Sequence, residues 1–96
     1  MGTPIVQLVV VTEEDFDNTE GSRLRGKVRQ EVLASSTRAQ DVKYEHPDNT
    51  IMVEVGPSIR FSEASIIRGL LRQVMEQEEY TVADEGIRAD TQQSGL

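Results

Sequence analysis

The first apolar run of the chain predicts a strand that is buried on both faces. Residues 4–12 read Pro-Ile-Val-Gln-Leu-Val-Val-Val-Thr, with no alternation between apolar and polar positions. The run is too short for a typical helix, and its β-branched residues favour an extended backbone. An apolar strand without alternation is typical of the middle of a sheet, so we expect residues 4–12 to be central.

The next apolar pattern, in residues 22–34, fits either a helix or a strand. One stripe of apolar residues recurs at every fourth position: Leu24, Val28 and Val32. This is helical spacing, and Asn18 or Thr19 would supply an N-cap. Gly26 disfavours a helix by roughly 1 kcal/mol relative to Ala, and the alternating charges of 23–29 also fit a strand. We favour the helix because the stripe continues to residue 34, and a crossover is the natural way to leave a central strand.

Two alternating segments around a turn predict a β-hairpin in residues 41–55. The positions expected to share a face are Val42, Tyr44 and His46 in the first segment, and Ile51, Val53 and Val55 in the second. Pro47-Asp48-Asn49 lies between them, and these residue types favour turns because Pro fixes φ while Asp and Asn hydrogen-bond to nearby backbone.

Residues 62–78 carry the most regular pattern and predict an amphipathic helix. Its apolar stripe consists of Ile66, Ile67, Leu70, Leu71 and Val74, and Ser62 is the expected N-cap. Tyr80-Thr81-Val82-Ala83 then predicts a short final strand. The polar residues 84–96 have few apolar side chains and predict a flexible tail.

Taken in order, these elements predict a single α+β domain in residues 1–83, followed by the tail at 84–96. A length of 96 residues suits one domain. Strand, helix, strand, strand, helix, strand is the ferredoxin-like βαββαβ order, which forms a two-layer sandwich with two helices on one face of a sheet. If residues 22–33 are instead a strand, the alternative is an antiparallel sheet with a single packed helix.

Composition narrows the class of protein. The chain has no cysteine, which excludes a disulfide framework and a zinc site of the Cys type. No apolar run approaches the roughly 18 residues of a membrane helix, and the N-terminus lacks the pattern of a secretory signal. We therefore expect a soluble, cytoplasmic, acidic protein with no membrane partner and no cofactor.

Charge is strongly segregated along the chain. The formal net charge is −7. Residues 1–20 contribute −5, residues 21–43 contribute +4, residues 44–75 contribute −1 and residues 76–96 contribute −5. A basic block therefore lies between acidic ones, and such blocks often mark interaction surfaces.

The leading hypothesis is a non-catalytic protein–protein interaction domain, an adaptor or assembly module that forms a homo-oligomer. The expected binding residues are the basic patch, defined as Arg23, Arg25, Lys27 and Arg29, with Tyr44 and Met52 as contacts on a sheet face. Edge strands offer unpaired backbone groups that could join two copies. Complementary charge blocks would steer that contact.

The alternative hypothesis is a small nucleic-acid-binding domain that uses the same basic patch. Four cations in seven residues could neutralise several phosphates. Only four aromatic residues are available for base stacking, and the net charge of −7 opposes approach to a polyanion, so this is the second choice.

A third hypothesis is phosphate or cation handling at Asp15 and Asp17. The run Asp15-Phe16-Asp17-Asn18-Thr19 resembles the DxDxT motif of haloacid-dehalogenase-type phosphotransferases, which would make Asp15 the nucleophile and Asp17 the residue that handles the leaving group. Three polar residues separate Asp15 from the apolar run, and the chain is too short for that family's domain. The calcium-loop spacing is also wrong, because Gly falls at position 21. We therefore expect no catalytic residues, no metal site and no enzyme activity.

Overall fold

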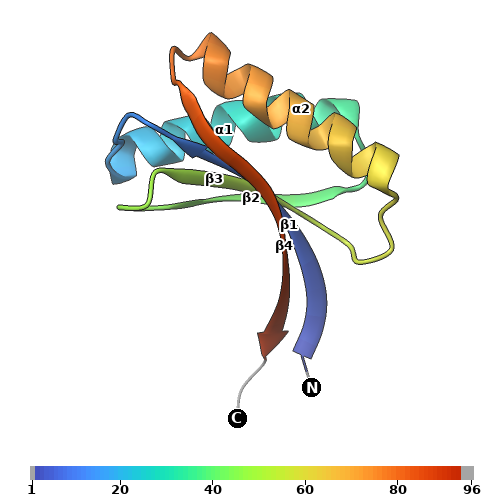
Figure 1. Ribbon diagram of the computed structural model, residues 1–96. Helices are drawn as coiled ribbons and strands as arrows, with labels where there is room; N and C mark the ends of the chain where they lie inside the picture. Colours follow the sequence, from blue (N-terminus) through green and yellow to red (C-terminus); the bar gives the residue numbers. More distant parts are fainter. Residues whose placement is uncertain (1, 94–96) are drawn as a thin grey trace.

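One four-stranded antiparallel sheet carries both helices on the same face (Figure 1). The computed structural model describes residues 2–93. In chain order its elements are β1 (Gly2–Thr12), α1 (Asn18–Ser35), β2 (Ala39–Glu45), β3 (Thr50–Val55), α2 (Phe61–Gln77) and β4 (Val82–Gln93). The order of strands across the sheet is β2-β3-β1-β4. The predicted α+β class is confirmed, and the ambiguous segment 22–33 is helical.

β1 is the central strand that the sequence predicts. It pairs with β3 on one side and with β4 on the other, and both pairings are antiparallel. Leu8, Val9 and Val10 follow one another and are all buried, although successive side chains of a strand point to opposite faces. Both faces of β1 are therefore covered in the folded protein.

The main core lies between the sheet and the helices. It is built from the inward side chains of β1 and β3 and from the apolar stripes of α1 and α2, whose fully buried members are Leu8, Val10, Leu24, Val28, Val32, Ile51, Val53, Val55, Leu71 and Met75. The predicted stripe of α1 faces this core together with Gly21, and most of the remainder of the helix is exposed. Neither helix of the described residues has the length and apolar character needed to cross a bilayer.

The start of α1 differs from the prediction. The carboxylate of Asp17 accepts a hydrogen bond from the backbone N–H of Glu20 at 2.8 Å, so Asp17 is the N-cap and Asn18 is already helical. The sequence alone does not exclude Asn18 or Thr19, because either side chain could accept such a bond. α2 likewise begins one residue before its expected cap, since Phe61 is its first residue.

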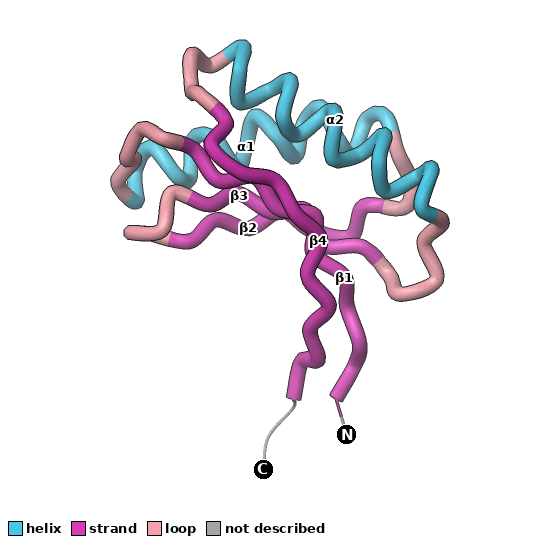
Figure 2. The backbone as a smooth tube through the Cα atoms, in the orientation of Figure 1, coloured by secondary structure: helices cyan, strands magenta, loops and turns pink. Residues whose placement is uncertain are grey.

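The C-terminal segment corrects the prediction of a polar tail after Ala83. β4 continues to Gln93, and its residues 84–93 pair with Val11 back to Gly2 without a break in register. β3 contacts only Val6–Val11, so beyond it β1 and β4 form a two-stranded ribbon that leaves the layered body (Figure 2). An edge strand can be polar because its outer side faces water, which explains why composition indicated a tail. Residues 94–96 of that prediction lie outside the described residues.

Two glycines of α1 provide a stability test of the helical assignment. Gly26 is exposed and nothing lies within 4 Å of a Cβ built there, so Gly26→Ala is expected to raise the free energy of unfolding by about 0.5–1 kcal/mol. At Gly21 the new Cβ would lie 2.6 Å from Cε2 of Tyr44. Gly21→Ala should therefore lower the free energy of unfolding by about 1–3 kcal/mol. Urea titrations measure both values, and a loss of stability in both variants would contradict the assignment.

Candidate interaction surfaces

The predicted basic patch lies on α1, where half of its charges are paired within the chain. Arg23 bridges Glu20 at 2.7 Å and Glu78 at 2.6 Å. Arg29 pairs with Asp41 of β2. Since these guanidinium groups already have carboxylate partners, the patch presents less free positive charge than its sequence indicates.

The contacts of Arg23 belong to a network that ties the start of α1 to the end of α2. Tyr80 donates a hydrogen bond from its hydroxyl to Glu20 at 2.6 Å. The Arg23 guanidinium and this hydroxyl lower the pKa of Glu20 to about 2. Burial, followed by the bond to Glu20, raises the pKa of Tyr80 to about 12. The network favours ionised Glu20 and neutral Tyr80 across the neutral range.

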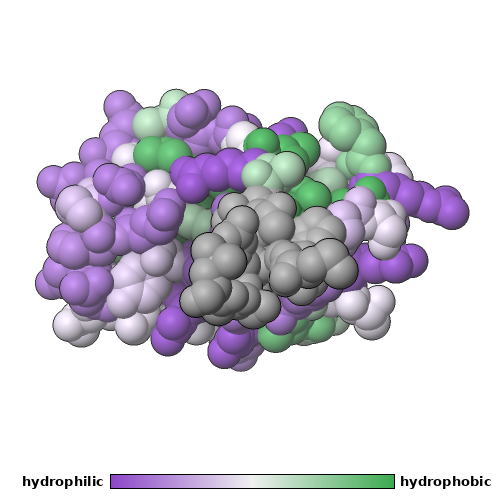
Figure 3. Space-filling model, turned by 90° about the horizontal axis from the view of Figure 1, so that it is seen from below, coloured by the Kyte–Doolittle hydropathy of each residue, from purple (hydrophilic) through white to green (hydrophobic). Residues whose placement is uncertain are grey.

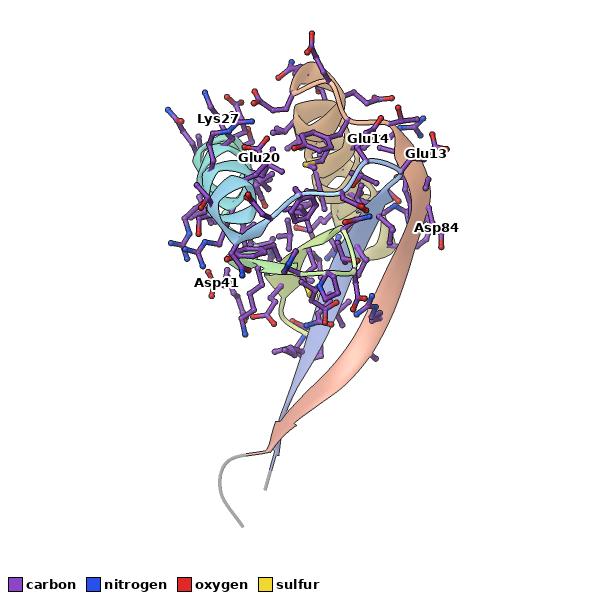
Figure 4. All side chains as sticks on the ribbon, turned by 90° about the vertical axis from the view of Figure 1, so that its left-hand side faces the viewer. Glu13, Glu14, Glu20, Lys27, Asp41 and Asp84 are labelled. Atoms are coloured by element: carbon purple, nitrogen blue, oxygen red, sulfur yellow. The ribbon has the colours of Figure 1, made fainter. Side chains whose placement is uncertain are left out.

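The other two members of the patch face different surroundings. Arg25 lies over the ring of Tyr44, with its Cζ 5.7 Å from the ring centroid, which is within cation–π range. Lys27 is exposed on the outer side of α1 (Figure 4), and among the described residues it has no ion pair within 4 Å. Only these two cations of the patch are free of carboxylate partners within the described part of the chain.

Tyr44 and Met52 lie on opposite faces of the sheet, which corrects their grouping as one contact surface. Tyr44 is opposite Ile51 in the β2–β3 register, so its side chain lies on the helix side of the sheet. There it packs against the core, and the ring of Phe16 contacts its ring edge-on. Met52 points away from the helices and is only 2% exposed. A partner could not reach both side chains on a single sheet face.

Ion pairs cross the face of the sheet that lies away from the helices. Arg88 of β4 reaches Glu45 of β2 at 3.2 Å, so the two edge strands are bridged across this face. Glu54, which is 6% exposed, accepts a hydrogen bond from Gln7 at 3.1 Å and pairs with Lys43. Within the described residues, ion pairs therefore cross this face of the sheet, where Met52 is buried.

The acidic segment that follows β1 has structural roles. Asp17 caps α1, and Asp15 accepts a hydrogen bond from Asn49 at 2.7 Å. Glu14 accepts hydrogen bonds from the backbone N–H of Thr81 at 2.6 Å and from its hydroxyl at 2.7 Å, and these bonds, the backbone one first, lower the pKa of Glu14. Within the described part of the chain, no three His, Asp or Glu side chains gather closely enough to hold a metal ion.

A small hollow opens between the start of β2 and the loop after β3. Its volume is about 160 Å³, and it is lined by Thr37, Arg38, Gln40, Gly56, Ser58 and Ile59. Small-molecule sites usually hold roughly 300–1,000 Å³. The Arg38 guanidinium at its border is also paired with Glu63 at 3.0 Å, so this hollow is a poor binding site for an organic ligand or an anion.

The two sheet edges differ in how they are protected against pairing. β2 has an irregular register between Ala39 and Asp41 and carries Lys43, and bulges and lysines are common protections of an edge. β4 is regular from Asp84 to Gln93 and contains neither lysine nor proline. From Asp84 onward β4 is therefore the more regular edge, without the bulge and the lysine of β2, and it lies in the segment that the sequence assigned to a tail.

Exposed apolar side chains are distributed over several elements. The large ones are Leu33, Phe61, Ile66 and Ile87, which come from α1, α2 and β4. In the view from below, hydrophobic atoms form separate groups between hydrophilic ones (Figure 3). Single exposed apolar residues are normal on protein surfaces, so these residues do not define a docking site without a second feature.

The network around Glu20 predicts a stability difference that depends on pH. Glu20→Gln should lower the free energy of unfolding by about 1 kcal/mol at pH 7, because the charge that Arg23 and Tyr80 stabilise is lost. The folded-state pKa of Glu20 is about 2, against 4.5 for the free group, so this stabilisation is complete above about pH 4.5. It should disappear as the pH falls towards 2.

Thermal unfolding from pH 2 to pH 7 measures this effect. Glu13→Gln is the matched control, because Glu13 is an exposed carboxylate of the same acidic segment, and its replacement should change little at any pH. A difference between wild type and Glu20→Gln that persists unchanged at pH 2 would show that charge is not its origin.

Comparisons with known proteins do not assign this chain to a family. No family model matches the chain, and no curated protein matches it. Function is therefore inferred from the surfaces themselves, and above all from the contrast between the two edges of the sheet.

Proposed function

We propose that this protein is a non-catalytic interaction domain that self-associates by pairing β4 with β4 of a second copy. The fold that presents this edge is a two-layer βαββαβ arrangement of the ferredoxin-like type. The observation that carries the proposal is the regular edge of β4 from Asp84 onward, which lacks a bulge and a lysine, whereas the edge of β2 is irregular at Gln40. An exposed strand of this kind is a ready template for another strand.

The chemistry of the β4 edge suits a reversible contact. Edge pairing satisfies backbone N–H and C=O groups that otherwise bind water, and it extends the sheet without rearranging the core. Ile87 is 47% exposed and would lose contact with water in such a pair. The contact is small compared with stable interfaces of roughly 1,200–2,000 Å², so we expect a dissociation constant in the range of about 1 µM to 1 mM.

This pairing does not use the basic patch. α1 packs against β2, whereas β4 lies at the other end of the sheet, and Lys27 and Asp84 are on opposite sides of the molecule (Figure 4). Nucleic-acid binding through the patch is less favoured because Arg23 and Arg29 are paired with carboxylates. Phosphate or cation handling at Asp15 is less favoured because its carboxylate contacts Asn49.

A lysine placed in β4 tests the proposal. Nothing lies within 4 Å of a Cβ built at Gly86, so Gly86→Lys should fold normally. It would place a charge in the edge and weaken self-association by roughly tenfold or more, as lysines do in natural edge strands. Sedimentation equilibrium of wild type and variant between about 10 µM and 1 mM, a range that brackets the expected constant, measures the change.

The matched control is Gly69→Lys. Gly69 is exposed on α2 and also has nothing within 4 Å, so Gly69→Lys adds the same charge on a helix instead of in the edge strand, and this variant should associate like wild type. A wild-type protein that stays monomeric over the whole concentration range would overturn the proposal. If Gln40→Lys on β2 weakens association while Gly86→Lys does not, the edge has been assigned to the wrong strand.

A further inference from the structure

The side chains of β4 alternate between two environments. Glu85 points to the helix side, where it pairs with Arg72 at 3.0 Å and with Arg68 at 3.8 Å. Arg88 points to the opposite face, where it meets Glu45. Because side chains alternate along a strand, Asp84 and Gly86 share the face of Arg88.

A two-fold axis restricts how two copies of β4 can pair. Directly opposite residues of an antiparallel pair point to the same face, and in an isologous contact each residue pair occurs twice. One residue of β4 therefore lies on the axis and faces itself. Residues at equal distances on either side of it then face one another.

Charge separates the four registers that place one of residues 85–88 on the axis. With Glu85 on the axis, two glutamates face each other, and with Arg88 on the axis, two arginines do. With Gly86 on the axis, Asp84 faces Arg88 of the partner subunit twice, which gives two opposite-charge pairs. With Ile87 on the axis, two isoleucines meet but Arg88 faces the partner's Gly86, without a carboxylate.

Local structure also favours Gly86 on the axis. Gly86 has no side chain, and glycine within a strand is common where another backbone approaches closely. The β1–β4 register is irregular between Val11 and Thr12, which pair with Asp84 and Val82, so the regular ladder begins at Asp84. Asp84 lies at the outer side of β4 in Figure 4, next to the open edge.

We propose that two copies of this chain pair through residues 84–88 of β4, with Gly86 on the two-fold axis and Asp84 opposite Arg88 of the partner subunit. This inference rests on the proposed edge pairing and specifies its partner and its register. Glu85 already has Arg68 and Arg72 as partners in its own subunit, so it needs none when it faces Ile87 of the partner subunit. Arg88 can bind Glu45 through Nη1 and present its other nitrogens to the partner's Asp84.

Complementary charge reversals test the register. Asp84→Arg places four positive charges at the interface, and Arg88→Asp places four negative ones, so each variant alone should associate roughly tenfold or more weakly than wild type. In an equimolar mixture each charge of one variant meets its opposite on the other. The mixture should therefore form a heterodimer with affinity close to that of wild type.

Sedimentation of each protein alone and of the mixture provides the measurement, and circular dichroism checks that each variant is folded. Glu31→Arg and Lys27→Asp are the matched controls, because they change the net charge by the same amounts at exposed positions of α1, the helix that packs against β2, and both should associate like wild type. If wild type dimerises and neither single reversal weakens it, the register is wrong while edge pairing stands. Weakening by Ile87→Asp alone would then favour the register with Ile87 on the axis. A monomeric wild type would overturn both proposals.

Discussion

The rest of the structure depends on the need to cover both faces of β1. Leu8 and Val10 point to one face and Val9 to the other, and all three are buried. The two amphipathic helices cover only one of these faces. On the other face Arg88 of one edge strand meets Glu45 of the opposite edge strand, and Val9 and Met52 are buried. In this way a chain of this size covers the second face of its central strand with ion-paired side chains of the sheet instead of further helices.

This arrangement decides which surfaces suit a partner. A face crossed by ion pairs is a poor docking surface, since a partner would have to displace Glu45 from Arg88 and Lys43 from Glu54. The helix layer is also engaged within the chain, because Arg23 joins α1 to Glu78 next to α2. The backbone at the edge of β4 differs from both, because pairing there would add contacts and break no internal ones.

Sequence patterns predicted the elements that carry an unbroken apolar run or an apolar stripe. The unbroken apolar run predicted β1 as a central strand, and the four-residue stripe through Leu24 and Val28 predicted α1 despite Gly26. β4 was not predicted beyond Ala83, because its pairing with β1 is a long-range backbone interaction, and its polar side chains resemble those of an unstructured tail. The alternation from Gly86 to Ala89 was a signal of a strand, but it is too short to decide without a partner strand.

The candidate site was predictable only in part, because side-chain pairing depends on neighbours that lie far along the chain. Arg23 and Arg29 counted as free cations in the sequence, yet each meets a carboxylate from another element. At the β4 edge, Asp84 has no ion pair within the described residues, and Arg88 contacts Glu45 through Nη1 alone. Asp84 and Arg88 are separated by four residues and share one face, so a two-fold axis at Gly86 makes the strand complementary to itself. A block of like charges lacks that property, and for this reason a short alternating edge is a better candidate for self-recognition than the more conspicuous basic patch.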